Sequence, residues 1–277
     1  MGISDAMKVL PFILGAVLAP AGLFNSALAG GPSDSDAERE ARWQQVSAYI
    51  FGDRKIEPTD SLIRIEAPAR ALDAALVPIT LVMPEKDKIK GVYLVIDDNP
   101  SPYAAHIAFG PAAEPSQVKL RVRIDSYTNV HAIAETKDGQ LFRAVAFVKA
   151  SGGCSAPMGV SDEEAMQGMG DMKMKFSSPA PPDGAIGATL MIRHPNFNGM
   201  QMNQITRNYT PARYIKQVTV AVGDRDVLTI DGDISISTDP VFGFSFVPRG
   251  DGSLKVVVVD SAGARWEQSF AAPALSN

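Results

Sequence analysis

Apolar and polar positions alternate with a period of two along much of the first half of the chain, the pattern of half-buried β-strands. The clearest case is Val118 to Ile124, where basic residues, Arg121 and Arg123 among them, alternate with apolar ones and are expected on the outer face. Such segments occur at Leu62–Glu66, Val77–Met83, Val92–Ile96, Val118–Ile124, Val130–Glu135 and Leu141–Lys149. Short strands at this spacing, with turn signals such as Asp138-Gly139 between them, predict a β-sandwich.

A second group of alternating segments begins after about thirty residues that lack the pattern. These segments are Ala188–Arg193, Tyr214–Val222, Val227–Ile230, Ile234–Ser237, Val241–Val247, Leu254–Asp260 and Ala264–Phe270. No shared motif recurs at a fixed offset between the two groups, so they are not obvious repeats. We therefore expect an all-β protein with two β-sandwich domains in tandem, residues 30–154 and 185–277, joined by a linker over residues 155–184.

Two short helices are expected outside the strands. Apolar residues at Trp43, Val46, Tyr49 and Ile50 have the three- and four-residue spacing of one helix face, which predicts a helix from Glu38 to Phe51. In the linker, Ser161 followed by Glu164 has the form of a capping box and predicts a helix from Asp162 to about Gln167. The linker ends in the Pro-rich stretch 177–184, expected to be a semi-rigid tether.

The first 29 residues have the composition of an export signal. Lys8 precedes an apolar stretch from Val9 to Leu23, and Ala27-Leu28-Ala29 is a small-residue cleavage pattern, so we expect cleavage after Ala29 and a periplasmic protein. Translation from Met7 would give a cleaner signal and the same mature chain. An uncleaved anchor is the alternative, although the apolar stretch is shorter than a bilayer span. We expect no membrane association after cleavage, because charge or proline interrupts every later apolar run.

Composition excludes several classes of function. The formal net charge is −5 and no cluster of Lys and Arg is present, which argues against nucleic acid as a partner. There is no glycine-rich phosphate loop and no dinucleotide fingerprint. His106, His131 and His194 lie in three separate segments without the spacing of metal ligands, and the acidic pairs fall at turns. We expect no cofactor and no metal site.

Cys154 is the only cysteine of the chain. It lies in the small-residue segment from Ala150 to Pro157, which is too small and flexible for the interior of a strand, so we expect its thiol to be exposed. In an oxidising compartment a cysteine with no partner in its own chain is free for reversible chemistry or for an intermolecular disulfide, including a homodimer. A thiolate is a nucleophile, and its bond to another sulfur forms and breaks by exchange.

Several motifs are shared with a known family. In the first half they are IEAP (65–68), VPITL (77–81), IDDNPSPYAAHIAF (96–109), RVRIDSYTNVHAIAETKDG (121–139) and VKASGGC (148–154). In the second half they are IRHPNFNGM (192–200), ARYIKQVTVAVGDRDVLT (212–229) and VFGFSFVP (241–248). Through them the first domain resembles SoxY, the sulfur carrier of periplasmic thiosulfate oxidation, and the second resembles its partner SoxZ. The resemblance is closest to fused SoxYZ-like carriers associated with quinoprotein dehydrogenases.

The resemblance implies two immunoglobulin-like sandwiches and a non-catalytic carrier. Cys154 would be the covalent attachment site for sulfur intermediates, presented to partner enzymes on a flexible arm that includes Gly152, Gly153 and Ser155. One departure bears on this role: SoxY typically ends after a Gly-Gly-Cys-Gly-Gly tail, whereas here Ser155-Ala156-Pro157 follows and the chain continues. An arm held at both ends must enter a partner as a hairpin, so the partner's site would be a more open groove, or the cargo would differ.

Other interpretations of the same residues stay open at this point. The methionines of the linker could bind Cu(I), with Cys154 as a further soft ligand, or could pack onto a sandwich; they are Met158, Met166, Met169, Met172 and Met174. A non-covalent accessory protein for a periplasmic quinoprotein dehydrogenase is the alternative of a different class. An incidental surface thiol and a cysteine hydrolase with His131 as base are further alternatives, although a flexible arm is unsuited to holding a nucleophile and base in fixed geometry.

Overall fold

The computed structural model describes residues 35–177, 184–204, 206–248 and 253–273. The expected export signal over residues 1–29 and most of the expected Pro-rich tether lie outside the described residues. Within the described part, no helix is long and apolar enough to cross a membrane.

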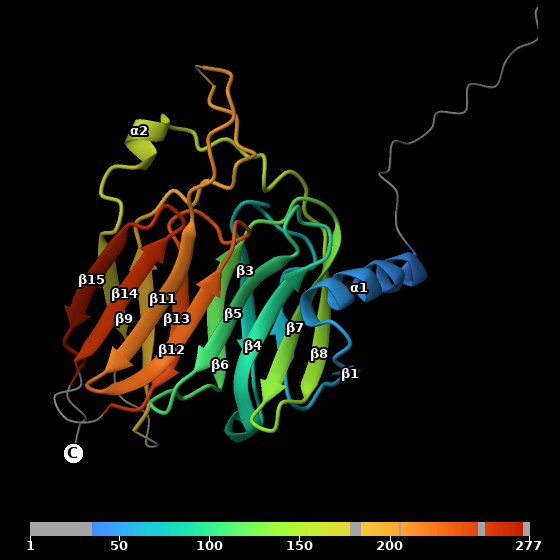
Figure 1. Ribbon diagram of the computed structural model, residues 1–277, viewed down its shortest axis with the longest axis vertical. Helices are drawn as coiled ribbons and strands as arrows, with labels where there is room; N and C mark the ends of the chain where they lie inside the picture. Colours follow the sequence, from blue (N-terminus) through green and yellow to red (C-terminus); the bar gives the residue numbers. More distant parts are fainter. Residues whose placement is uncertain (1–34, 178–183, 205, 249–252, 274–277) are drawn as a thin grey trace, which may run out of the picture. The chain divides into compact units, whose positions relative to one another are not determined.

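The first half of the chain contains one helix followed by eight strands (Figure 1). They are α1 (Asp36–Phe51), β1 (Ile56–Pro58), β2 (Arg64–Glu66), β3 (Val77–Val82), the 3-10 turn η1 (Lys86–Lys88), β4 (Ile89–Ile96), β5 (Tyr103–Phe109), β6 (Gln117–Val122), β7 (Thr128–Thr136) and β8 (Leu141–Val148). Every strand expected here is present. β1 and β5 were not expected, because β1 has three residues and β5 is rich in alanine and lacks a clear alternation.

The second half begins with a short helix and continues with seven strands. They are α2 (Asp162–Ala165), β9 (Met172–Phe176), β10 (Ile186–Ile192), β11 (Ile215–Val222), β12 (Arg225–Gly232), β13 (Val241–Phe246), β14 (Leu254–Asp260) and β15 (Arg265–Phe270). The expected strand Ile234–Ser237 is wrong: this segment makes only an isolated bridge between Ile236 and Val122. Conversely, β9 lies in the stretch assigned to the linker and pairs with β10.

The strands form two sheets, and both sheets run through both halves of the chain (Figure 1). The larger has the order β1-β8-β7-β4-β5-β12-β11-β14-β15, and the smaller has the order β2-β3-β6-β13-β10-β9. Antiparallel pairing of β5 with β12 and of β6 with β13 joins the halves. A single apolar cluster lies between the sheets and extends from Ile63 to Val258. The all-β sandwich prediction is therefore confirmed, but the two sandwiches are fused edge to edge.

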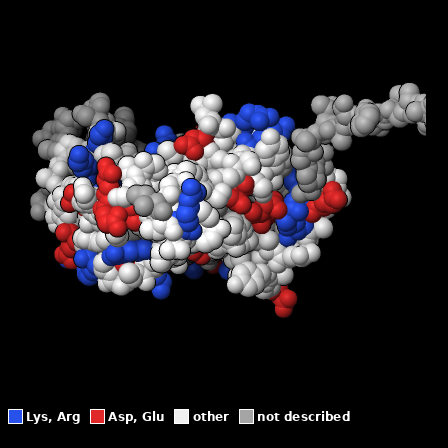
Figure 2. Space-filling view, turned by 90° about the horizontal axis from the view of Figure 1, so that it is seen from above, with Lys and Arg blue, Asp and Glu red and all other residues white. Residues whose placement is uncertain are grey.

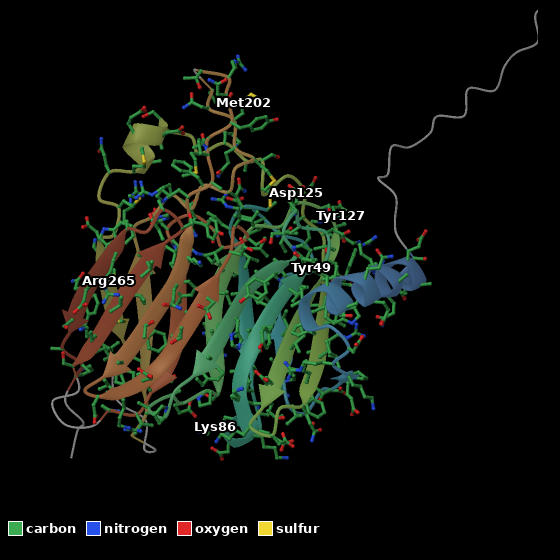
Figure 3. All side chains as sticks on the ribbon, in the orientation of Figure 1. Tyr49, Lys86, Asp125, Tyr127, Met202 and Arg265 are labelled. Carbon is green, nitrogen blue, oxygen red and sulfur yellow. The ribbon has the colours of Figure 1, made fainter. Side chains whose placement is uncertain are left out.

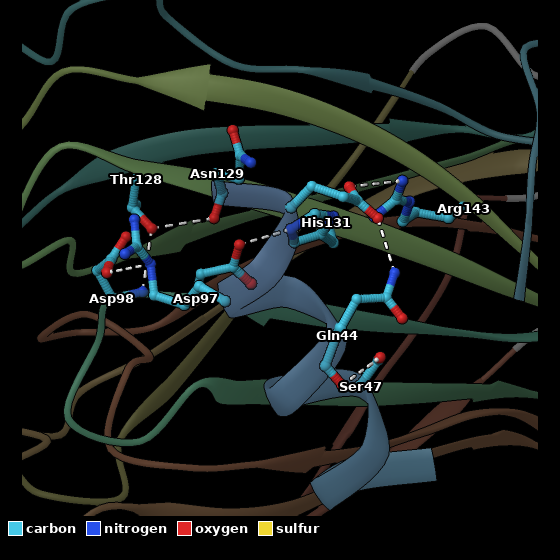
Figure 4. A network of polar contacts seen from close by, with 10 residues as sticks. Gln44, Ser47, Asp97, Asp98, Thr128, Asn129, His131 and Arg143 are labelled. Atoms are coloured by element: carbon cyan, nitrogen blue, oxygen red, sulfur yellow. Dashed lines mark hydrogen bonds and ion pairs between the residues drawn. The ribbon is translucent and has the colours of Figure 1, made fainter. Parts of the chain in front are cut away.

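Helix α1 packs on the outer face of the larger sheet through Trp43, whose ring stacks on His131 with centroids 4.0 Å apart. His131 Nε2 in turn lies 2.8 Å from Asp97 Oδ2 (Figure 4). The expected helix is confirmed, and a capping box from Ser35 starts it. Tyr49, however, is 86% exposed, contrary to the expected face. At about 100° per residue it lies about 120° from Trp43, outside the apolar stripe.

Several loops meet at one end of the two sheets and build the candidate site. They are the β4–β5 turn, the β6–β7 turn, the segment after β8, and the β10–β11 and β12–β13 connections. Asp125 and Met202 lie at this end and Lys86 lies at the opposite end (Figure 3). Hydrogen bonds between these loops include that from Asn99 Nδ2 to Ser235 Oγ, which links the two halves of the chain at 2.9 Å.

Candidate functional site

Cys154 is buried, with 2% of its surface exposed, so the expectation of an exposed thiol is wrong for this structure. The segment that contains it follows β8 and runs back over the β6–β7 turn. Gly152 N–H donates to the carbonyl of Asp125 at 2.7 Å, and Gly153 N–H donates to the carbonyl of Ile124 at 3.0 Å. The N–H of Cys154 donates to the Asp125 carboxylate at 3.3 Å. The expected arm is therefore bound along a neighbouring turn.

The second half of the chain also holds this segment. Asn198, on the β10–β11 connection, donates from its side-chain amide to the carbonyl of Cys154 at 2.7 Å. The Asn198 side chain is itself placed, because its Oδ1 accepts from the N–H of Met200 at 2.9 Å and its backbone N–H donates to Gln201 Oε1 at 3.1 Å. Only 4% of Asn198 is exposed. The two halves thus close on Cys154 from two sides.

The two glycines before Cys154 are needed for this bound conformation. Gly152 has a φ of +74°, in the left-handed region that glycine adopts without strain. A Cβ on Gly153 would lie 2.1 Å from the carbonyl oxygen of Ala74 and 2.5 Å from that of Ile124. Ser155 is exposed, and its hydroxyl donates to the carbonyl of Gly152 at 3.4 Å. Gly153 therefore permits a close backbone approach, in addition to any flexibility that it gives the segment.

Burial raises the pKa of the Cys154 thiol to about 12, with a further increase from the nearby Asp125 carboxylate and a partial decrease from Arg123. At neutral pH the thiol in this conformation is protonated. Since the thiolate is the reactive form, Cys154 is a poor nucleophile while it stays in this position. Its surroundings are nevertheless polar: Cys154 is not a member of the apolar cluster between the sheets, and Arg123, Asp125 and Asn198 lie around it.

Arg123, which the alternation placed on the outer face, is only 2% exposed. The covering residues come from the segment after Cys154 and from the β12–β13 connection. With residues between β2 and β3, they line a cavity of about 330 Å³ that is partly open to solvent and includes Arg121, Arg123, Pro157, Met158 and Thr238, among others. The alternation assigned Arg123 to the correct face of the sheet. It could not predict that loops cover this face, because such loops do not change the sequence pattern of the strand.

The three histidines lie at three separate places, as the sequence indicated. His131 is paired with Asp97, His106 stacks on Tyr93 with centroids 4.1 Å apart, and His194 lies 3.7 Å from the carboxylate of Asp260. The charged neighbours of Cys154 are Asp125 and Arg123, not a histidine, so nothing here supports a cysteine hydrolase. Among the described residues, no group of three or more His, Cys, Asp and Glu side chains could hold a metal ion.

Three of the five methionines of the expected linker have protein contacts that account for them. Met172 is buried in the apolar cluster and Met174 packs against it, both on the same face of β9. The sulfur of Met158 accepts hydrogen bonds from the amide of Gln201 at 3.4 Å and from the hydroxyl of Thr238 at 3.6 Å. Their contacts favour the packing explanation over a copper site.

Sequence reasoning identified Cys154 and its glycines but missed the residues that hold them. Asp125, Asn198 and Arg123 were quoted within shared motifs, yet no role was assigned to them. Asn198 is 44 residues from Cys154 in the chain, and only the pairing of the two halves brings it there. The available signal was an Asn within a shared motif. Its burial could not be predicted, because the burial of a loop residue produces no periodic pattern in the sequence.

Two family models match the chain. Residues 47–154 match the family described as sulfur oxidation protein SoxY, and residues 174–271 match the family described as sulphur oxidation protein SoxZ. The SoxY match ends on Cys154. Among solved structures, the sulfur carrier protein SoxY from Chlorobium limicola f thiosulfatophilum is 27% identical over 41% of this chain and 96% of its own, with a TM-score of 0.35. A superoxide reductase (neelaredoxin) from Ignicoccus hospitalis is 16% identical over 34% of this chain and 93% of its own, with a TM-score of 0.30. No curated protein matches.

Proposed function

Because the chain is a fused SoxYZ-like protein, with a SoxY domain followed by a SoxZ domain, we propose that it carries sulfur-containing intermediates covalently on the Cys154 thiol. In this proposal the protein is exported to the periplasm and is itself no enzyme. Partner enzymes of a sulfur-oxidation pathway, or of a related quinoprotein dehydrogenase-linked pathway, carry out the redox steps on the bound sulfur.

The observation that carries the proposal is the position of the one cysteine. The sequence has a single thiol, and it is the last residue of the SoxY match. Loading by exchange needs no external oxidant: the thiolate attacks one sulfur of an S–S bond, the new S–S bond forms as the old one breaks, and the leaving sulfur takes the electron pair. The proton of the thiol goes to solvent. Unloading by a partner follows the same chemistry in reverse.

The buried position of Cys154 makes this a carrier with a retracted state. Four hydrogen bonds hold the segment: those donated by the N–H groups of Gly152, Gly153 and Cys154, and the one accepted from Asn198. At about 0.5–1.5 kcal/mol each, releasing them costs roughly 2–6 kcal/mol. Local opening in this range is common in folded proteins, and it would return the thiol to water and to its ordinary pKa. Loading and unloading then occur in the open state.

Retraction also has a use for a carrier. A thiol that is protonated and inaccessible resists oxidation and exchange with the small thiols and oxidants around it. A sulfur intermediate drawn into the same position would be shielded in the same way between one partner and the next. The free energy of opening sets the fraction of time that the cargo is accessible to a partner. The hydrogen bonds of the segment therefore control the rate of transfer.

Intact mass spectrometry on protein isolated from the periplasm of its host tests the proposal. We expect sulfur adducts on wild type, such as +32 increments, that are released by a reducing agent, and none on Cys154→Ser. Ser155→Ala is the matched control, because it changes the neighbouring side chain and leaves the thiol. The same spectrum reports the expected cleavage after Ala29. Full activity of the host pathway with Cys154→Ser would contradict carriage.

A further inference from the structure

Arg123 is a buried cation without an anionic partner. Its Nη2 donates to Thr238 Oγ1 at 2.5 Å and to the carbonyl of Asn196 at 3.3 Å, and both acceptors are neutral. Its Nε–H is buried and has no acceptor. Among the described residues, no carboxylate lies within 4.0 Å of the guanidinium. A buried charge of this kind is costly unless an anion compensates it, so an anion bound beside Arg123 would be stabilised by the guanidinium.

A second arginine faces the same cavity. Arg121 also lines the 330 Å³ cavity, and its Nε is likewise buried without an acceptor, while its Nη2 donates to the carbonyl of Asp239 at 3.1 Å. The cavity continues along Ala156 and Pro157, the residues that directly follow the thiol-bearing segment. Its volume is about ten times the ~30 Å³ that one water occupies in the liquid, which is enough for a small oxyanion.

The carboxylates at the cavity do not cancel the two guanidinium charges. Asp239 lines the cavity, but its carboxylate is bound by Arg193 at 2.6 Å and by the N–H of His194 at 3.0 Å. Asp73 also lines the cavity; it is exposed and accepts from the N–H of Ala75 at 2.8 Å. Asp125 is occupied by the N–H of Cys154. With the Arg193–Asp239 pair counted as neutral, the two arginines face one exposed carboxylate, that of Asp73, which leaves one positive charge in excess at the cavity.

We propose that Arg123, assisted by Arg121, binds the negatively charged end of the cargo carried on Cys154, so that the retracted site selects oxyanion-ended adducts such as a sulfonate. This inference rests on the proposed function and adds the residues that recognise the free end of the cargo. A guanidinium offers parallel N–H donors that match the oxygens of such a group. Charge-assisted hydrogen bonds in a buried site are stronger than those in water.

The surface at this end of the molecule does not make the same selection. Basic and acidic side chains are both present there, with uncharged surface between them (Figure 2). An anion approaching from solvent meets no broad field of one sign. Discrimination by charge therefore occurs inside the cavity, after the segment has closed over its cargo.

A pair of thiol reagents with opposite charges tests the proposal on the full-length protein. Sulfonatoethyl and trimethylammonioethyl methanethiosulfonate each form a disulfide with Cys154, displacing methanesulfinate, and leave ends of similar size that differ in charge. We then measure by intact mass the rate at which an uncharged phosphine, tris(hydroxypropyl)phosphine, removes each adduct; the phosphine cleaves the disulfide and is oxidised to its oxide with oxygen from water. We expect the sulfonate-ended adduct to be released about tenfold more slowly than the ammonium-ended one. We expect the two rates to converge in Arg123→Gln and the difference to return partly in Arg123→Lys.

The matched control is Lys119→Gln, which removes the same charge from the same face of β6 but outside the cavity. It should keep the wild-type ratio of release rates. Far-UV circular dichroism confirms the fold of each variant, and Arg121→Gln, at a half-buried position, provides a second test if Arg123→Gln does not fold. Equal release of both adducts from folded wild type, or an unchanged ratio in both arginine variants, would overturn the proposal.

A second measurement uses a free oxyanion. Thiosulfate at constant ionic strength should raise the unfolding temperature of Cys154→Ser relative to chloride, and the double variant with Arg123→Gln should lose this effect. A higher unfolding temperature in thiosulfate shows that an unattached oxyanion also fits the site. If the unfolding temperature does not change but the two adducts are released at different rates, the anion must be tethered to Cys154. Absence of both effects overturns the proposal. Both measurements use added reagents, so they stand even where protein isolated from the host carries no sulfur adduct.

Discussion

At the scale of the residue, the state of Cys154 depends on where its thiol lies. Burial and the nearby Asp125 carboxylate raise the pKa, and Arg123 only partly offsets them. The closed conformation therefore holds a neutral thiol. In the proposed carrier cycle, opening of the segment produces the nucleophile, so a conformational equilibrium and not a permanently activated thiolate controls reactivity.

The raised pKa predicts a loss of stability in base. The unfolded chain ionises its thiol near the ordinary value of about 9, whereas the folded chain holds the proton until about pH 12. Between these values the unfolded state binds fewer protons, so rising pH favours unfolding by about 1.4 kcal/mol per pH unit. We expect the stability of wild type to fall relative to Cys154→Ser above pH 9, measured by urea unfolding at pH 7, 9 and 10. The tyrosines titrate in both proteins and cancel in the difference, and parallel stability curves would contradict the prediction.

Asn198 should control access to the thiol. Asn198→Ala removes the hydrogen bond to the Cys154 carbonyl, worth about 1 kcal/mol, and raises the population of the open segment about fivefold. We expect iodoacetamide to modify Cys154 faster by that factor, measured by intact mass at pH 8. Asn208→Ala, an exposed position on the same β10–β11 connection, should leave the rate unchanged. Equal rates for the two variants would show that Asn198 does not restrain the segment.

At the scale of the element, periodicity predicted those strands that are long and solvated on one face. Val118–Ile124 alternates clearly and is a strand in the structure as β6. β5 was not predicted because it lies in the middle of the larger sheet, and its three alanines and His106 leave no clear alternation of apolar and polar residues. The segment after β8 was expected to be mobile, since its glycines were interpreted as flexibility. Its bound conformation depends on close contact with Ala74 and Ile124, which no local pattern encodes.

This segment should respond to a single added methyl group. Gly153→Ala places a Cβ against the carbonyl oxygens of Ala74 and Ile124, so the segment cannot close and Cys154 stays in water. We expect at least a tenfold increase in the rate of iodoacetamide modification, with a pH dependence that reports an ordinary thiol pKa. Gly159→Ala is the control: it adds the same methyl group a few residues after Cys154, at a φ of +76°, but nothing lies within 4 Å of the new Cβ. A Gly153→Ala thiol as slow as that of wild type would mean that the segment closes in another way.

At the scale of the whole molecule, the two domains share their sheets. The sequence separates them well, because a stretch without alternation lies between two groups of strands. It does not show that β5 pairs with β12 or β6 with β13, since pairing between edge strands leaves no periodic signal. Joining the halves covers edges that would otherwise be exposed and places Asn198 against Cys154. The site is therefore a property of the fused pair.

Shared sheets predict that both halves unfold together. The chain has two tryptophans, with Trp43 on α1 in the first half and Trp266 on β15 in the second, so Trp266→Phe and Trp43→Phe each leave one reporter in one half. Within each variant, we expect the fluorescence transition in urea to coincide with the far-UV circular dichroism transition, because the apolar cluster is continuous through both halves. Comparing two probes within one variant removes the effect of the substitution itself. A fluorescence midpoint that departs from the dichroism midpoint in either variant would show that one half unfolds alone, and that Cys154 can lose its Asn198 contact without opening of its own segment.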